Sequence, residues 1–151
     1  MNRFASVLVF LLLLLRVESH AFNCSVATTP LTFGDYDVFS HGPLDSTGTI
    51  RVDCNNPPSK PLSVVISVSK GGNESFNPRQ MRGGGDRINY FIHTDSTRGR
   101  ILGDGTGGSV TLENIVSNSA PWTTTVYGRI PPGQDVGVGV YSDALTVNIT
   151  W

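Results

Sequence analysis

The chain has 151 residues, with 11 lysines and arginines against 12 aspartates and glutamates, and its 17 glycines and 9 prolines all lie after residue 21. A nearly neutral chain without clustered basic residues lacks the electrostatic signature of a nucleic-acid-binding protein. Its glycines and prolines are spread between short apolar runs, which argues against long helices and predicts many short strands.

The first 21 residues are typical of a secretory signal. Arg3 provides a positive charge, an uninterrupted apolar run covers residues 7–15, and small residues precede a cleavage site after Ala21. The apolar run is shorter than the roughly 20 residues that a membrane-spanning helix needs. We therefore predict a signal peptide over residues 1–21 and one exported domain over residues 22–151.

Cys24 and Cys54 are the two cysteines of the chain. Because exported proteins meet oxidising conditions, these two thiols are expected to form a disulfide. On a chain-entropy estimate the bond would stabilise the fold by about 3–4 kcal/mol. The alternative is a pair of free, buried thiols.

The first predicted strands follow the signal closely. Residues 24–26 and 31–33 form a strand interrupted at Pro30, which favours the edge of a sheet because proline cannot donate to a ladder. Residues 48–54 alternate between apolar and polar side chains, and residues 62–69 repeat that pattern.

A glycine-rich loop over residues 83–86 leads into a strand predicted over residues 88–94. In this strand His93 is expected to be a surface residue, on the face opposite Ile92. No segment keeps a helical period over three turns, so the pattern predicts an all-β sandwich. The remaining predicted strands cover residues 101–102, 110–112, 123–130, 136–141 and 144–151.

The last predicted strand has the most regular alternation, and the chain stops on its Trp151. Terminal residues usually fray, so an apolar residue there suggests a strand that is held on both sides. An immunoglobulin-like sandwich needs about seven strands. The pattern supports about six, with nothing after Trp151 to form another.

Several short motifs also follow one another in a fixed order from Cys24 to Trp151. Their residues are Cys24, Val26, Phe33, Gly34, Tyr36, Gly48, Ile50, Val52, Cys54, Arg79, Met81, Ile88, Tyr90, Gly103, Asp104, Gly105, Thr106, Gly107, Tyr127, Gly128, Arg129, Ile130, Pro131, Pro132, Gly133, Gln134, Gly139, Tyr141 and Asp143. In their order and spacing the motifs resemble the spore coat U domain family, which includes the subunits of archaic chaperone–usher pili.

The resemblance implies an immunoglobulin-like sandwich that lacks its final strand and has an apolar groove beside its last one. In such subunits a periplasmic chaperone fills the groove first, and the N-terminal extension of a neighbouring subunit replaces it at an outer-membrane usher. The product is an extracellular pilus that supports surface adhesion and biofilm formation. The added strand forms main-chain hydrogen bonds and its alternate side chains fill pockets. We assign one wall of the groove to Leu145, Val147, Ile149 and Trp151.

The chain departs from the family's rod subunits at its N-terminus. After cleavage only Phe22 and Asn23 would precede Cys24, where rod subunits carry a longer donor segment. We therefore expect a protein that accepts a strand and has none to give, as at the distal end of a fibre or in a coat. Its position along a fibre stays open.

Few residues suggest catalysis or cofactor binding. His41 and His93 are the histidines of the exported part, which has no nucleophile elbow and no His/Cys cluster at metal spacing. The glycines of residues 103–108 satisfy a dinucleotide pattern, but a strand is predicted after them where that chemistry needs a helix. We predict a non-catalytic protein without metal or cofactor. The alternatives are a free-standing secreted coat protein of a resting cell and, more remotely, an exported hydrolase.

Overall fold

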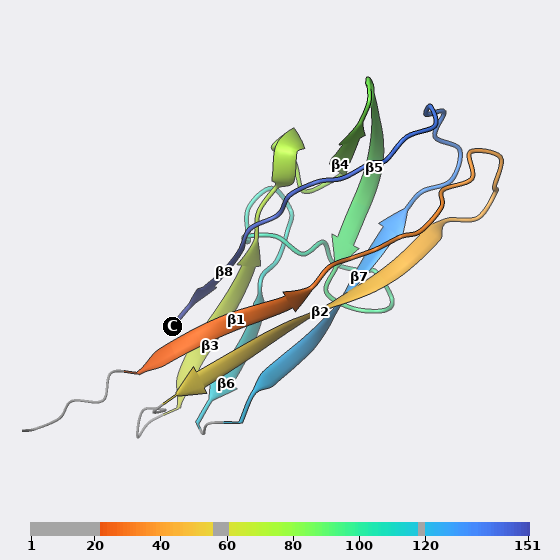
Figure 1. Ribbon diagram of the computed structural model, residues 1–151. Helices are drawn as coiled ribbons and strands as arrows, with labels where there is room; N and C mark the ends of the chain where they lie inside the picture. Colours follow the sequence, from red (N-terminus) through yellow and green to blue (C-terminus); the bar gives the residue numbers. More distant parts are fainter. Residues whose placement is uncertain (1–21, 56–60, 118–119) are drawn as a thin grey trace, which may run out of the picture.

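The structure is a computed structural model that describes residues 22–55, 61–117 and 120–151. The predicted signal peptide over residues 1–21 lies outside the described residues. These residues form eight strands and one short 3-10 helix, η1 (Gly71–Asn73), which confirms the predicted all-β class (Figure 1). None of their helical segments is long and apolar enough to cross a membrane.

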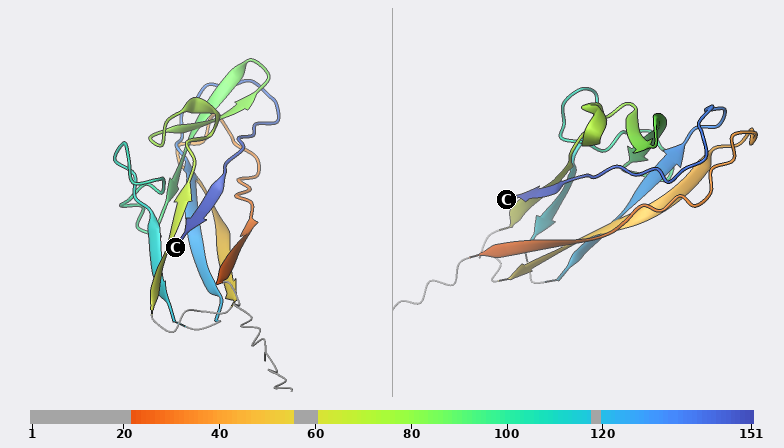
Figure 2. Two further views of the ribbon diagram at one scale, coloured as in Figure 1. Left: turned by 90° about the vertical axis from the view of Figure 1, so that its left-hand side faces the viewer. Right: turned by 45° about the horizontal axis from the view of Figure 1, so that its top comes forward.

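The strands form two antiparallel sheets that pack face to face (Figure 2). The larger sheet has the order β1-β2-β7-β5-β4, made of β1 (Asn23–Thr29), β2 (Leu44–Asn55), β7 (Trp122–Ile130), β5 (Asp86–His93) and β4 (Arg79–Gly83). The smaller sheet has the order β6-β3-β8, made of β6 (Leu112–Val116), β3 (Leu62–Val68) and β8 (Val147–Thr150).

The core lies between the two sheets and follows from the alternation of side chains along each strand. Three inward-facing residues of β2 and three of β3 are at most 3% exposed. The pairing of β2 with β7 runs from Leu44 opposite Ile130 to Val52 opposite Trp122 and gives the larger sheet its centre. The residues of β2 and β3 that meet in the core are Ile50, Val52, Cys54, Val64, Ile66 and Val68.

The predicted disulfide is present at the edge of the larger sheet. Cys24 of β1 lies opposite Cys54 of β2 in the antiparallel register, and their sulfur atoms are 2.04 Å apart. The strand ends directly before Pro30, and β1 is an edge strand, as the proline indicated. Residues 31–33 continue in the same direction without being part of a strand.

Other boundaries differ from the sequence-based expectations. The strand β4 was not predicted, and β6 covers Leu112–Val116 where residues 110–112 were expected. Residues 136–141 form no strand, because Gly137 instead donates its N–H to Asp86 Oδ2 (2.8 Å) and accepts from the Tyr141 hydroxyl (2.8 Å). These two bonds occupy the main-chain N–H and C=O groups of Gly137, which a strand would need for its ladder.

The expectation that His93 is a surface residue is wrong. The residue is 7% exposed, at the end of β5 where residues 101–102 pair with the strand. Leu102 donates its N–H to Ile92 O (2.8 Å), and His93 forms an isolated bridge with Ile101. The outward-facing position of His93 on the strand therefore does not expose it to solvent.

The last strand is held on one side. Among the described residues β8 pairs with β3, from Val147 opposite Val68 to Thr150 opposite Val65, and it forms the edge of the smaller sheet. Trp151 follows it, is 48% exposed, and meets the Phe22 ring edge to face at 5.8 Å. The expectation of a strand held on both sides is wrong, because β8 is the last strand of the smaller sheet and has a ladder partner on one side.

Candidate strand-binding groove

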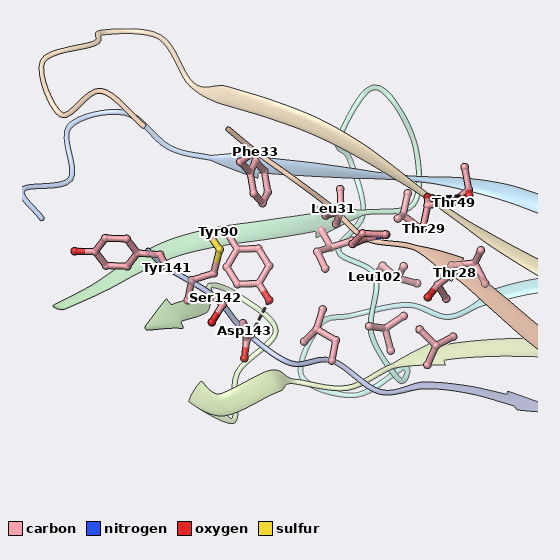
Figure 3. A pocket seen from close by; sticks show the side chains of 18 residues that line it. Thr28, Thr29, Leu31, Phe33, Thr49, Tyr90, Leu102, Tyr141, Ser142 and Asp143 are labelled. Carbon is pink, nitrogen blue, oxygen red and sulfur yellow. Dashed lines mark hydrogen bonds between the residues drawn. The ribbon is translucent and has the colours of Figure 1, made fainter. Parts of the chain in front are cut away.

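An apolar groove with a volume of about 350 Å³ opens between the chain that follows β1 and the chain that leads into β8 (Figure 3). We call residues 28–33 its β1-side wall and residues 141–147 its C-terminal wall. Its floor consists of core residues from both sheets, each at most 6% exposed. The floor residues are Ile50, Val68, Ile92, Leu102 and Val126. The groove therefore reaches the hydrophobic core itself.

The β1-side wall rests on two glycines of the larger sheet. A Cβ atom on Gly128 would lie 2.7 Å from Phe33 Cζ and 3.0 Å from Leu31 Cδ2. A Cβ atom on Gly48 would lie 3.3 Å from Leu31 Cγ. Because both glycines lack a side chain, Leu31 and Phe33 lie directly on the sheet, and the Phe33 ring meets the Tyr90 ring edge to face at 6.2 Å.

Hydrogen bonds fix the chain just beyond this wall. Gly34 turns it with a φ of 77°, and the Tyr36 hydroxyl then donates to Pro131 O (2.9 Å) and accepts from Gln134 N (3.0 Å). The Gln134 side chain accepts from Asn89 N (2.7 Å) and donates to Asn89 O (3.0 Å), so its amide replaces a strand partner for β5. The motif over residues 127–134 thus holds residues 34–36, which lie outside the groove.

The C-terminal wall alternates over a longer stretch than β8 itself. Every second residue is half-buried and those between them are exposed. Leu145 and Val147, two of the four residues assigned from the sequence, line the groove. Ile149 packs against the core beyond the groove, and Trp151 lies past its end. The half-buried residues are Tyr141, Asp143, Leu145, Val147 and Ile149.

Sequence reasoning missed the opposite wall and the floor. Pro30 was the available signal, because it separates the paired part of β1 from an unpaired continuation. Six residues of the family motifs also line the groove, although no role in it was assigned to them: Phe33, Ile50, Met81, Tyr90, Tyr141 and Asp143. The motifs therefore gather at the groove although they are far apart in the chain.

Arg79 lies beneath this region and is fully buried. Its guanidinium donates to Ser69 O (2.9 and 3.1 Å) and to Leu102 O (2.9 Å), and it lies 5.0 Å from the centre of the Phe76 ring. Burial lowers the pKa of Arg79 from its ordinary value. This side chain joins the end of β3 to the chain that supplies Leu102 to the groove floor.

The glycine-rich loop over residues 103–108 is a closed turn. Gly105 has a φ of 88°, and Asp104 Oδ1 accepts from Thr106 N (2.9 Å) and Thr106 Oγ1 (2.6 Å), which lowers the pKa of Asp104. The chain continues into β6 and not into a helix, so the loop lacks the helix N-terminus of a dinucleotide site. Within the described residues no group of three or more His, Cys, Asp or Glu could hold a metal ion.

Two packed antiparallel sheets with an open groove beside an edge strand define an incomplete immunoglobulin-like β-sandwich. The chain belongs to the Spore Coat Protein U domain family, whose model matches residues 11–148. This match confirms the resemblance drawn from the motifs. The chain is 31% identical over 134 residues to "Protein U" of Myxococcus xanthus, covering 80% of this chain and 71% of that protein.

One solved structure shares the fold. One chain in the crystal structure of the CsuC–CsuE chaperone–tip adhesion subunit pre-assembly complex, from the archaic chaperone–usher Csu pili of Acinetobacter baumannii, aligns with a TM-score of 0.60 and 17% identity. The alignment covers 87% of this chain and 40% of that chain, so this chain spans about two fifths of its length. The E. coli Hda pilus minor tip subunit HdaB aligns with a TM-score of 0.40 and 13% identity, covering 83% of this chain and 79% of that chain.

Proposed function

We propose that this chain is a non-catalytic structural subunit of an archaic chaperone–usher pilus, completed by a strand that another protein inserts into the groove. The observation that carries this proposal is the groove between residues 28–33 and residues 141–147, which is open down to the core. It lies beside the edge strand β8 and the chain that leads into it, so a strand laid in it would meet an edge and a core together.

The chemistry of the groove favours an extended chain as its occupant. An edge strand directs alternate N–H and C=O groups away from its partner, and these groups can pair with one more strand. Alternate side chains of that strand would point to Ile50, Val68 and Leu102 on the floor. Each apolar side chain that is fully buried there contributes about 1.5–3 kcal/mol.

The partners follow from this proposal and from the solved pre-assembly complex of a chaperone with a tip subunit. A periplasmic chaperone is the first occupant of the groove, and a segment of a neighbouring subunit replaces it at an outer-membrane usher. This route places the protein in an extracellular pilus at the cell surface, where it supports adhesion and biofilm formation. The predicted signal peptide over residues 1–21 would direct the chain into that route.

A second candidate function is a free-standing secreted coat protein. The family description, Spore Coat Protein U domain, favours it together with the 31% identity to Protein U, which is matched over 71% of its length. A coat protein of this kind would have to keep its groove closed without a chaperone. The two candidates therefore differ in whether the purified chain needs a partner to stay folded.

Co-expression with the chaperone gene nearest to its own tests the proposal. We expect the full chain to be exported and recovered as a soluble one-to-one complex, and to be degraded or aggregated without the chaperone. Val147→Asp should abolish the complex, because an occupant would bury an unpaired carboxylate in the groove at a cost of several kcal/mol. Asn148→Asp is the matched control, since Asn148 is the next residue of β8 and is exposed.

Equal recovery of the Val147→Asp and Asn148→Asp variants would contradict the assignment of the groove. A wild-type chain that is monomeric, melts cooperatively at high temperature and ignores the chaperone would favour the coat protein. The pair of variants thereby separates an error about the groove from an error about the function.

A further inference from the structure

A group of hydrogen bonds lies at one end of the groove, where the C-terminal wall meets β5 and η1. Asp143 Oδ2 accepts from the Tyr90 hydroxyl at 2.7 Å (Figure 3), and Asp143 Oδ1 accepts from Gly72 N at 2.9 Å. Tyr90 is 3% exposed, and burial together with the bond to Asp143 raises the pKa of its hydroxyl. Both carboxylate oxygens of Asp143 therefore have a donor.

Asp143 occupies an inward-facing position of the alternating wall. Tyr141 and Leu145, two residues away on each side, are apolar and half-buried in the same row. A carboxylate in such a row is costly unless it is hydrogen-bonded. The chain accommodates it at Gly71, which has a φ of 75° and where a Cβ atom would collide with the Asp143 carboxylate.

The backbone beside Asp143 is fixed at the same place. Ser142 and Arg82 exchange two main-chain hydrogen bonds of 2.9 and 3.0 Å, which join the C-terminal wall to the free edge of β4. Further along, Thr146 accepts from Ser69 N (2.9 Å) and donates its N–H to Ser69 Oγ (2.9 Å), and at Val147 the chain enters its ladder with β3. The wall is thus attached to the larger sheet at one end and to the smaller sheet at the other, and it borders the groove over the length between them.

We propose that Asp143 and Tyr90 are positioning residues that hold the C-terminal wall of the empty groove in the place where it receives a strand. This inference rests on the proposed function. The empty wall has one free edge, so its position before binding depends on the bonds of Ser142 and Asp143 at one end and on those of Thr146 and β8 at the other. Once a strand is bound, its ladder holds the wall and the attachment adds little. Such preorganisation lowers the ordering cost of binding.

The proposal predicts where the effect of a substitution falls. Tyr90→Phe removes the hydroxyl and keeps the ring that faces Phe33. The association rate constant for a strand should fall by about tenfold, the factor that corresponds to 1.4 kcal/mol, near the lower end for a hydrogen bond to a charged group. The dissociation rate constant should stay within about twofold, because the bound state no longer depends on the bond.

Tyr36→Phe is the matched control. Its hydroxyl also makes two hydrogen bonds from a half-buried tyrosine, but to Pro131 and Gln134, and Tyr36 does not line the groove. The probe is a synthetic peptide of ten alternating valine and threonine residues with two lysines added at each end. Its binding to the full chain is followed by stopped-flow tryptophan fluorescence, and Tyr36→Phe should bind it at the wild-type rate.

A second measurement covers the case in which Tyr90→Phe does not stay folded with an empty groove. The full chain is extended after Trp151 by an Asn-Gly turn and the same ten alternating residues, so that the groove is filled from its own chain. In this filled form Tyr90→Phe should lower the melting temperature no more than Tyr36→Phe does. In the empty form its loss should be clearly larger, up to complete unfolding.

Each possible result either supports or overturns the positioning role of Tyr90 and Asp143. Slower association with unchanged dissociation, or a loss confined to the empty form, supports the positioning role. Equal association rates for Tyr90→Phe and Tyr36→Phe, or equal losses in the empty and filled forms, overturn it and leave the proposed function intact. A wild-type chain that neither binds the peptide nor gains stability from the added strand would overturn the proposed function, and this inference with it.

Discussion

Loss of the disulfide between Cys24 and Cys54 is expected to lower the free energy of unfolding by about 3.6 kcal/mol. The bond joins residues that are 30 positions apart. For a closed loop of that length the chain-entropy relation gives about 12 cal/mol/K, or about 3.6 kcal/mol at 25 °C. Small domains have about 5–15 kcal/mol in total, so the cross-link supplies a large share of the stability.

The position of the bond makes its effect relevant to the groove. It joins the start of the edge strand β1 to β2, and among the described residues β1 has no second ladder partner. The far end of β1 supplies Thr28 and Thr29 to the β1-side wall. Without the bond, fraying of β1 from its start would reach that wall, since only the β1–β2 ladder would then hold it.

Urea unfolding of the wild type before and after reduction measures the effect directly. Reduction keeps both sulfur atoms, whereas the Cys24→Ala/Cys54→Ala variant also removes their packing, because the two side chains are 7% and 3% exposed. With a slope of about 1–3 kcal/mol per molar urea, the midpoint should fall by about 1–4 M. A reduced protein within about 1 kcal/mol of the oxidised one would refute the reasoning, because the ladder alone would then hold β1.

Two further predictions concern buried positions. Burial lowers the pKa of His93 from its ordinary value of 6.5, so below about pH 6.5 the unfolded chain binds a proton at this residue more readily than the folded chain does. The free energy of unfolding should therefore fall as the pH drops below about 6.5. Urea midpoints at about pH 7.5 and 5.5 measure this loss of stability, which should be weaker in His93→Gln and unchanged in the control His41→Gln, on an exposed loop. The same loss in both variants would contradict the role of His93. Gly128→Ala should cost about 1–3 kcal/mol by thermal melting, because its methyl group would press on Phe33 and Leu31. Gly42→Ala, with nothing within 4 Å of its Cβ, is the control, and equal melting temperatures would contradict the close packing of that wall.

Local pattern predicted much of the fold, and its failures have identifiable causes. The alternation of β2, β3 and β5 was readable because one face of each strand meets the core. The strand β4 was not readable, because its first inward residue is Arg79, whose burial depends on the carbonyl groups of Ser69 and Leu102. Residues 136–141 have strand-forming residues, yet Gly137 bonds to Asp86 across the loop and prevents a ladder.

The sequence by itself determined the class of this protein. The period of two, the turns at glycine and proline, the cysteine pair and the order of the motifs are properties of neighbouring residues, so they could be read along the chain. The groove is a property of distant ones. Its walls come from both ends of the domain, its floor from both sheets, and the bond from Tyr90 to Asp143 joins residues 53 positions apart. Only the packing of the two sheets decided that β8 keeps a free edge and that this edge opens onto the core.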